Sequence, residues 1–253
     1  MSQMVKYRVN GHEHEAEQNA SLLGELRKNG YEVPSLCFHE ALSPYGACRL
    51  CLVEVKKGRR QRLTTSCNYP VQEGIEVHLD TEKVQRNRRM VLELLLAQAP
   101  KAPKELHRLA ARYGVGAVRF PLNGDEECIL CGLCARACSE GLGADALTFS
   151  GRGDLKRMGT PYATASADCV GCEACARTCP TGAIHVEEGA GKRTIWGRTF
   201  TLARCPDCGG WLLPPEQIAL LVKRSGLAHE YFERCETCRR RDTADRFKAV
   251  MDP

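Results

Sequence analysis

Alternating hydrophobic and polar positions near the start of the chain predict a small β-sheet. Residues 3–9 alternate, and Asn10-Gly11 is a turn pair typical of a two-residue hairpin that leads into a polar second strand. A second hairpin and one further strand are predicted from the same pattern at residues 52–56, 62–65 and 75–79.

Between the two hairpins, the hydrophobic spacing changes to a helical period. It predicts a helix over residues 22–29, with Ser21 as its N-terminal cap and Gly30 at its C-terminal end. A helix packed on a sheet of two hairpins is typical of a β-grasp fold. We therefore expect residues 1–80 to form a β-grasp domain.

The next segment is predicted to be helical. Residues 81–98 carry hydrophobic positions on a helical period, and Asp80 or Thr81 is available as the cap. The proline-containing stretch 100–103 ends this helix, and a shorter helix is predicted over 104–113, stopping at Gly114. We expect residues 81–118 to be a structural linker.

Cysteine usage changes the picture, because 16 of the 253 residues are cysteine. They form four groups of four, each with at least one C-x-x-C pair. Disulfides would require a secreted protein, but no signal-peptide pattern is visible, and the longest apolar run, 90–99, is interrupted and too short to span a bilayer. Clustered thiols and an expected cytoplasmic location favour metal binding.

The charge balance says less about function. The formal net charge is +5, from 36 basic and 31 acidic residues. The basic stretches 56–62 and 239–241 are typical of solvated surface or of a docking face for an acidic partner. Aromatic residues make up only 6% of the chain, so a nucleic-acid-binding regulator is the weakest hypothesis.

The first cysteine group favours a [2Fe–2S] cluster. Its spacing is C-x10-C-x2-C-x15-C, with only one close pair, whereas structural zinc sites usually combine two close pairs. Gly46 lies in the loop before the close pair, where it permits a close approach of the backbone to a cluster. The predicted ligands are Cys37, Cys48, Cys51 and Cys67.

The second and third groups share the spacing C-x2-C-x2-C-x3-C and indicate an internal duplication. In bacterial-type ferredoxins with two [4Fe–4S] clusters, the fourth cysteine of each run binds the other cluster. One cluster is therefore predicted at Cys128, Cys131, Cys134 and Cys179, and its neighbour at Cys169, Cys172, Cys175 and Cys138. We assign residues 119–192 to this domain, with 148–156 as an insertion and Ser139 where such runs usually have proline.

The last four cysteines, in residues 193–253, are two C-x-x-C pairs flanking a helix predicted near 215–225. The Gly-Gly after the first pair gives the tight turn of a zinc-ribbon-like module, so a structural zinc is predicted. A third [4Fe–4S] cluster is the alternative. The residues concerned are Cys205, Cys208, Cys235 and Cys238.

Four sequence stretches carry a resemblance to a known family: residues 45–55, 65–77, 88–96 and 109–115. They resemble the N-terminal part of the large iron–sulfur subunit of complex I, and equally the diaphorase small subunits of NAD-linked hydrogenases and formate dehydrogenases. The resemblance implies that Cys37, Cys48, Cys51 and Cys67 are cluster ligands. It also implies two partners, an NADH-oxidising flavoprotein subunit and a hydrogenase or formate dehydrogenase catalytic subunit.

One departure from this family stands out. The family usually places a histidine and three cysteines, which bind a further cluster, between the first and second cysteine groups. This chain has no cysteine between Cys67 and Cys128, and His107 is interpreted as an ordinary surface histidine of a helix. We expect that additional cluster to be absent.

No catalytic residues are identified. Residues 189–194 faintly resemble a phosphate-binding loop but lack its first glycine, so a turn between strands is predicted. The expectation is an α+β chain with a β-grasp domain, a helical linker, a twin-cluster ferredoxin domain and a zinc-ribbon-like module. It would transfer electrons within a hetero-oligomeric complex. A free-standing multicluster ferredoxin or redox sensor is the alternative.

Overall fold

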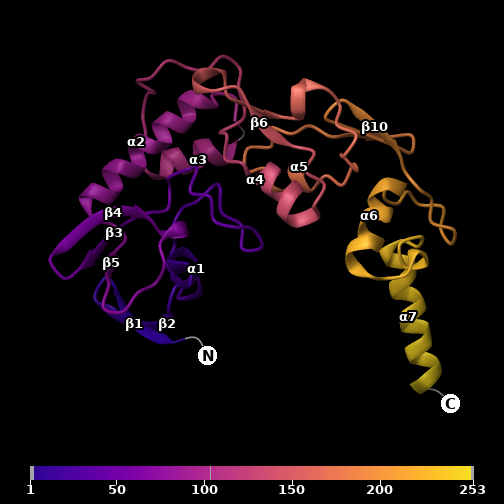
Figure 1. Cartoon of the computed structure of the whole chain (residues 1–253), viewed down its shortest axis with the longest axis horizontal. Coiled ribbons are helices and arrows are strands. Elements are labelled where there is room, and N and C mark those ends of the chain that lie inside the picture. Colours follow the sequence, from indigo (N-terminus) through magenta and orange to yellow (C-terminus); the bar gives the residue numbers. More distant parts are fainter. Residues whose placement is uncertain (1–2, 103, 252–253) are drawn as a thin grey trace. The chain divides into compact units, whose positions relative to one another are not determined.

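The computed structural model describes residues 3–102 and 104–251 (Figure 1). The chain divides into two compact units that exchange a segment. The first contains the chain up to Arg136 together with Thr178–Ala183, and the second contains Ala137–Arg177 and the chain from Ile184 onward. The domain boundaries expected at residues 80, 118 and 192 stay predictions.

The first unit opens with a five-stranded sheet in the order β2-β1-β5-β3-β4. β1 and β5 are parallel, and the other neighbours are antiparallel. This is the predicted β-grasp arrangement, with Asn10 and Gly11 both at positive φ in the first turn. The strands are β1 (Met4–Val9), β2 (His12–Glu17), β3 (Leu52–Lys57), β4 (Arg60–Thr65) and β5 (Glu76–His78).

Helix α1 (Leu22–Lys28) packs on this sheet and buries all three of its leucines. The predicted cap position at Ser21 is confirmed, but the usual capping hydrogen bond is absent. Ser21 stands at the N-cap position without a capping hydrogen bond, and its hydroxyl instead donates to the carbonyl of Cys67 at 3.1 Å. The start of the helix is thus tied to the last cysteine of the first group.

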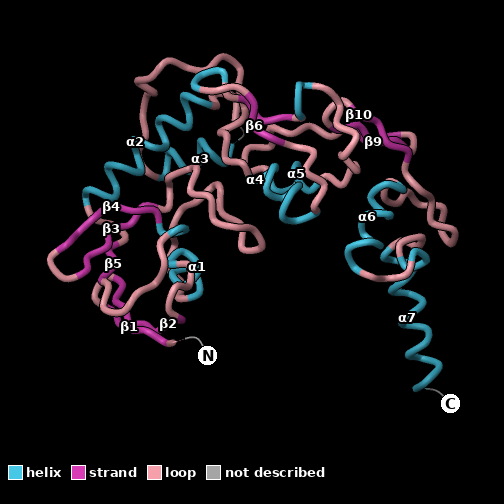
Figure 2. The backbone as a smooth tube through the Cα atoms, viewed as in Figure 1, coloured by secondary structure: helices cyan, strands magenta, loops and turns pink. Residues whose placement is uncertain are grey.

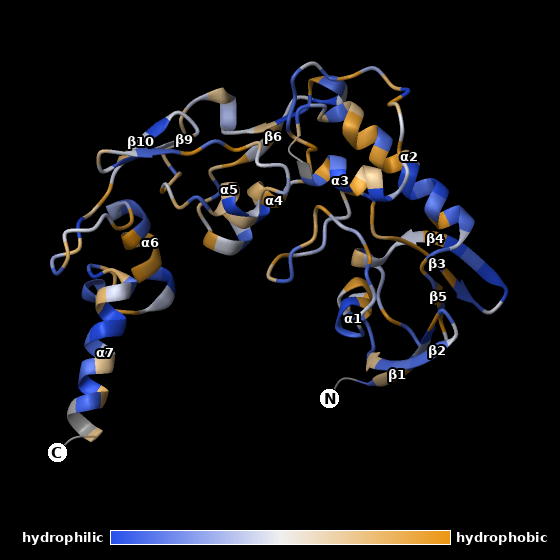
Figure 3. Cartoon of the chain, turned by 180° about the vertical axis from the view of Figure 1, so that it is seen from behind, coloured by the Kyte–Doolittle hydropathy of each residue, from blue (hydrophilic) through white to orange (hydrophobic). Residues whose placement is uncertain are grey.

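Helix α2 (Glu82–Gln98) begins as predicted, with the Thr81 hydroxyl accepting from the amide of Val84 at 3.2 Å. Its first half is hydrophilic and its second half hydrophobic (Figure 3). Arg88 nevertheless lies buried, 1% exposed, and donates to the Leu52 carbonyl at 2.7 Å. This contact holds α2 against strand β3.

The second linker helix, α3 (Lys104–Arg112), follows the predicted break and is followed by Gly114 at positive φ. Pro103, one of the residues expected to make that break, lies outside the described residues. His107 is exposed on α3, as predicted. No helix in the described part of the chain has the length and apolar character needed to cross a membrane.

The twin-cysteine region consists mostly of loops (Figure 2). Ser139 lies within the π-helical turn Ala137–Leu142 and accepts from the amide of Gly143 at 2.8 Å. In the second run, Pro180 comes directly after the end of the corresponding helix, where a proline ring would clash with further helical turns. The regular elements are α4 (Leu133–Arg136), α5 (Ala174–Thr178), and the hairpin of β6 (Thr148–Ser150) and β7 (Arg157–Gly159). Short 3-10 turns lie at Ser66–Asn68, Gly153–Leu155 and Pro161–Ala163.

The remainder of the second unit has a three-stranded antiparallel sheet in the order β10-β9-β8, then two helices. The turn predicted within 189–194 connects β8 and β9, and the predicted helix near 215–225 is α6. Strand β10 and helix α7 were not predicted. The elements are β8 (Glu187–Gly189), β9 (Lys192–Ile195), β10 (Arg198–Thr201), α6 (Pro215–Ser225), the 3-10 turn His229–Tyr231, and α7 (Glu236–Met251).

Candidate metal centres

The first cysteine group forms two thiol pairs inside the β-grasp domain, each cysteine at most 2% exposed. The Cys48 thiol donates to Cys37 and lowers the pKa of Cys37 to about 6. The Cys67 thiol donates to Cys51 in the same way and lowers the pKa of Cys51 to about 7. A [2Fe–2S] cluster needs two thiolates on each of two irons, and two pairs of thiols fit that requirement.

Backbone groups also face these sulfurs. The amide of Leu36 donates to Cys48 Sγ at 3.3 Å, and the amide of Cys48 donates to Cys37 Sγ at 3.4 Å. Gly46 has a φ of +73°, and a Cβ at this position would lie 2.6 Å from the Asn68 side chain. The predicted close approach at Gly46 is therefore made by Asn68, whose Oδ1 lies 2.6 Å from Cys67 Sγ.

Arg136 connects this loop to the second cysteine group within the first unit. Its Nη2 donates to the Cys37 carbonyl at 2.7 Å, its Nη1 donates to the Ser43 carbonyl, and its guanidinium lies 5.5 Å from the ring centre of Tyr45. Arg136 ends α4, two residues after Cys134. The sequence does not single out Arg136, because the second run also has an arginine two residues after its third cysteine.

The first unit brings Cys179 together with Cys128, Cys131 and Cys134. Burial raises the pKa of Cys131 to about 12, and the nearby Cys179 adds to the rise. Burial, followed by the charges of Glu126 and Cys179, raises the pKa of Cys128. The amide of Leu130 donates to Cys128 Sγ at 3.4 Å. The fourth cysteine of the second run thus lies with the first two of the first run, which supports the crossed assignment.

The second unit brings Cys138 together with Cys169, Cys172 and Cys175. These cysteines line one small cavity, whose wall also includes Ile195 and Trp196. The amide of Ala146 donates to Cys138 Sγ at 3.3 Å. Four converging thiols in a small enclosed space fit a [4Fe–4S] cluster.

The hairpin of β9 and β10 is hydrogen-bonded to the loop whose cysteines line this cavity. Arg198 donates to the Cys169 carbonyl at 2.7 Å, and Arg193 donates to the Gly171 carbonyl at 2.8 Å. Gly171 has a φ of +68°, and a Cβ there would lie 2.7 Å from the Phe200 ring. Sequence reasoning missed this support, because nothing local links the hairpin to the cysteines that precede it.

A buried ion pair within this support gives a testable expectation. Arg193 pairs with Glu173 at 2.6 Å, with both side chains at most 11% exposed. Arg193→Met leaves the Glu173 carboxylate buried without that partner, which is expected to cost about 3–5 kcal/mol of stability. The midpoint of anaerobic thermal unfolding, followed by circular dichroism, measures the loss.

Arg177→Met is the matched control for this substitution. Arg177 pairs with the same carboxylate at 3.0 Å, but its side chain is 77% exposed. Removing it is expected to cost about 1 kcal/mol or less, because solvent screens an exposed pair. Equal effects of the two substitutions would contradict a structural role for the buried pair.

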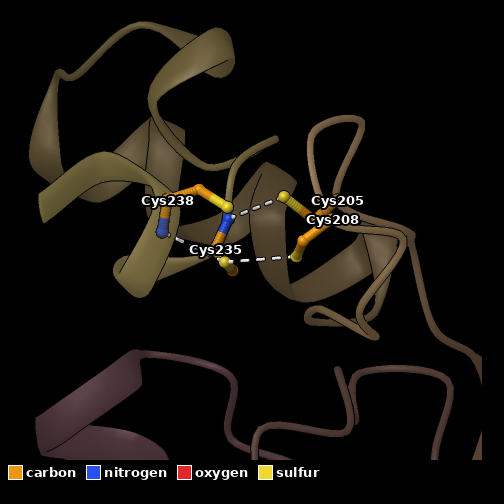
Figure 4. Close-up of side chains that lie close together, drawn as sticks. All are labelled: Cys205, Cys208, Cys235 and Cys238. Carbon is orange, nitrogen blue, oxygen red and sulfur yellow. Dashed lines mark hydrogen bonds between the residues drawn. The ribbon is translucent and has the colours of Figure 1, made fainter. Parts of the chain in front are cut away.

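The last four cysteines form a much tighter site (Figure 4). Their sulfurs all lie within 4.8 Å of one another, and Cys208 Sγ is 3.7 Å from Cys235 Sγ. A tetrahedral zinc with Zn–S bonds of about 2.3 Å places its sulfurs about 3.8 Å apart. Across residues 3–102 and 104–251, this is the single group of three or more potential ligands gathered closely enough for one metal ion.

Local structure explains how this site forms. The amide of Gly209, at a φ of +68°, donates to the Cys205 carbonyl at 2.9 Å, which closes the predicted glycine turn. The amide of Cys235 donates to Cys205 Sγ at 3.4 Å and, as the main cause, lowers the pKa of Cys205 to about 6. Cys238 lies in the first turn of α7, and its thiol hydrogen bond to Cys235 is the main cause that raises the pKa of Cys238 to about 12.

Comparisons with known proteins agree with these sites. Residues 2–82 match the 2Fe-2S iron-sulfur cluster binding domain, and residues 127–183 match the 4Fe-4S dicluster domain. A chain in the crystal structure of an NAD+-reducing [NiFe]-hydrogenase in the H2-reduced state superposes with a TM-score of 0.61 and 30% sequence identity. The match covers 71% of this chain and 86% of that chain. The chain belongs to the iron–sulfur subunit family of NAD-linked oxidoreductases.

Two curated relatives extend the likeness of this iron–sulfur subunit. The alpha subunit of the NADPH-Fe(3+) oxidoreductase of Geobacter sulfurreducens (strain DL-1 / KN400) is 29% identical over 81% of this chain and 27% of its own length. An NADH-quinone oxidoreductase subunit of Rickettsia bellii (strain RML369-C) is 29% identical over 76% of this chain and 31% of its own length. The chain thus spans less than a third of these relatives.

The family confirms the main sequence predictions. The iron–sulfur subunit has a mixed α and β fold with a 2Fe-2S domain, a 4Fe-4S dicluster domain and a C-terminal cysteine group. The predicted resemblance to complex I and to an NAD-linked hydrogenase is also confirmed. An electron-transfer role as a subunit of NAD-linked complexes follows from this membership.

Proposed function

We propose that this subunit relays electrons between an NAD(H)-linked flavoprotein and a partner redox module, a hydrogenase or a formate dehydrogenase. The observation that carries the proposal is the arrangement of twelve thiols: two bonded pairs in the β-grasp domain, and two twin-run sets, each joined by the fourth cysteine of the other run. A [2Fe–2S] cluster would be held by Cys37, Cys48, Cys51 and Cys67. The two [4Fe–4S] clusters would be held by Cys128, Cys131, Cys134 and Cys179, and by Cys138, Cys169, Cys172 and Cys175.

When bound, such clusters exchange single electrons at potentials set by charge, exposure and hydrogen bonds to sulfur. The residues of the chain hold and orient these sites. Arg136 ties the loop of Cys37 to the helix that contains Cys134. Cys37 lies near enough to Cys131 to contribute to the raised pKa of Cys131. This proximity supports a relay in which electrons pass directly between the [2Fe–2S] site and the first [4Fe–4S] site. The additional cluster with histidine and cysteine ligands, which the family usually has, is then not needed.

For the last four cysteines we propose a structural zinc, with a third [4Fe–4S] cluster as the alternative to be tested. The supporting observation is the 3.7 Å separation of Cys208 and Cys235 sulfurs, which suits one central ion. A cubane carries each thiolate on a different iron and keeps the sulfurs farther apart. None of the sixteen cysteines is in a disulfide, so all of them are available as metal ligands.

Metal analysis of an anaerobic preparation tests the cofactor content. We expect about ten irons per chain, from one [2Fe–2S] and two [4Fe–4S] clusters, with about one zinc. About fourteen irons without zinc would instead assign a third [4Fe–4S] cluster to the last four cysteines. A value near six irons would contradict the twin-cluster assignment.

Purification of the tagged chain from its native host under gentle, oxygen-free conditions tests the partners. We expect it to bring down a flavoprotein that oxidises NADH and a hydrogenase or formate dehydrogenase. A fully loaded chain that elutes as a monomer, and that NADH does not reduce through any co-purifying protein, would support a free-standing ferredoxin or redox sensor instead.

A further inference from the structure

Trp196 contacts the second twin-cluster site. It lies outside both matched domain regions, the second of which ends at residue 183. It lies at the turn between β9 and β10, and its indole Nε1 donates to Cys175 Sγ at 3.5 Å. The indole also forms part of the wall of the cavity that Cys138, Cys169 and Cys172 line. One side chain thus supplies both a hydrogen bond to a thiol and a cover over the site.

The backbone shows that the turn itself does not call for tryptophan. Trp196 and Gly197 have φ values of 53° and 74°, so both residues are left-handed, as in a type I′ hairpin turn. Asparagine is preferred at the first of these positions, and a bulky residue there is a conformational outlier. The first hairpin of this chain follows the preference with Asn10 and Gly11. A strained residue that also touches a candidate site points to a role in that site.

The surrounding contacts fix where the indole points. The β9–β10 hairpin is fastened to the loop of residues 166–172 by Arg193 and Arg198, through the carbonyls of Gly171 and Cys169. The Phe200 ring packs where Gly171 lacks a side chain. These contacts hold the turn in one position relative to Cys175.

We propose that Trp196 is a positioning residue that raises the reduction potential of the [4Fe–4S] cluster at Cys138, Cys169, Cys172 and Cys175 and shields that cluster from water. The inference rests on the proposed function, in which these thiols hold a cubane. Reduction adds one negative charge that the thiolates share, so an N–H donor to sulfur stabilises the reduced form more than the oxidised form. The apolar ring system controls solvent access to the same site.

The test is a redox titration of the full-length, anaerobically loaded protein, followed by electron paramagnetic resonance. Trp196→Phe keeps an aromatic ring and removes the N–H group. We expect reduction of this cluster to become about fivefold less favourable, a midpoint potential about 40 mV more negative, since tenfold is 59 mV for one electron. The midpoints of the other clusters should not move. The signal that disappears in Cys172→Ser identifies the cluster concerned.

Trp211→Phe is the matched control. Trp211 is the other tryptophan of the second unit, 46% exposed, with its ring 4.0 Å from the Arg204 guanidinium. This substitution should leave all midpoints unchanged. An unchanged midpoint in Trp196→Phe, or a shift of the same size in Trp211→Phe, overturns the potential-setting role. A Trp196→Phe protein that folds without this cluster also overturns it, in favour of a structural role.

Trp196→Asn tests the shielding role separately, because asparagine suits the backbone of the turn. We expect this variant to keep its circular dichroism spectrum and to lose the visible absorbance of the cluster in air severalfold faster than the unsubstituted protein. Equal rates of loss contradict shielding. Absence of the second [4Fe–4S] signal from the unsubstituted protein is a different result, because it contradicts the proposed function and not the role of Trp196.

Discussion

Replacing Cys51 by serine is expected to stop the reduction of the twin-cluster sites by NADH in the assembled complex. Cys51 is 1% exposed, and its sulfur is paired with Cys67. A serine hydroxyl does not supply the thiolate that an iron–sulfur cluster needs. Mutation of a residue that hydrogen-bonds to a metal ligand lowers activity by up to roughly a hundredfold. Mutation of a ligand itself should lower activity at least as much. NADH-dependent turnover and paramagnetic resonance of the three sites measure the effect.

Two controls make the result specific to the first site. A strong chemical reductant should still reduce the twin-cluster sites of Cys51→Ser, because their ligands come from other parts of the chain. Cys172→Ser should show the reverse pattern, with the [2Fe–2S] signal still produced by NADH and the second [4Fe–4S] signal missing. Unchanged NADH-dependent turnover in Cys51→Ser would refute the entry role of the first site.

The second large effect is expected at the C-terminal site. Cys205→Ser should lower the zinc content from about one per chain to near zero and unfold the segment that contains α6 and α7. The reason is that most side chains of α7 are exposed and bury little surface of their own. The α7 surface is largely hydrophilic, and Phe247 and Met251 on it are 69% and 79% exposed. Zinc analysis, the helical circular dichroism signal and limited proteolysis beyond residue 203 measure the change.

Asp207→Asn is the control for Cys205→Ser. It removes the 2.5 Å ion pair between Asp207 and Arg234, which joins the two cysteine pairs, and it keeps all four thiols. Zinc content should stay the same, and the helical signal should change little, because a partly exposed ion pair contributes little. If Cys205→Ser keeps its fold but loses electron transfer, the last four cysteines hold an iron–sulfur cluster and not zinc.

The β-grasp elements could be predicted because their signals are local. Alternation marks the strands, and Asn10-Gly11 has the backbone preference that a two-residue turn requires. The cap position of Ser21 was predicted by the same kind of reasoning, but its side chain makes no capping hydrogen bond, because a non-local partner competes. The Ser21 hydroxyl donates to the carbonyl of Cys67, 46 residues away, and the sequence around Ser21 contains no sign of that contact.

The cysteine groups could also be predicted, since ligand spacing is a local property. The residues that support them could not. Arg136 and Arg177 occupy equivalent places in the two runs, but Arg136 contacts the loop of Cys37 while Arg177 pairs with Glu173. Trp196 follows Cys175 by 21 residues and reaches it only because the β9–β10 hairpin folds over the loop. Such roles depend on packing between distant segments.

The exchanged segment between the two units has a consequence for biosynthesis. Cys179 lies with the first unit and Cys138 with the second, so neither half of the duplication assembles four thiols from its own run. A nascent chain therefore cannot complete either twin-cluster site until Cys175 has left the ribosome, and the other site needs Cys179, four residues later. Both sites become ready for loading at nearly the same moment of translation. A chain that is cut short anywhere before Cys175 should acquire neither twin cluster.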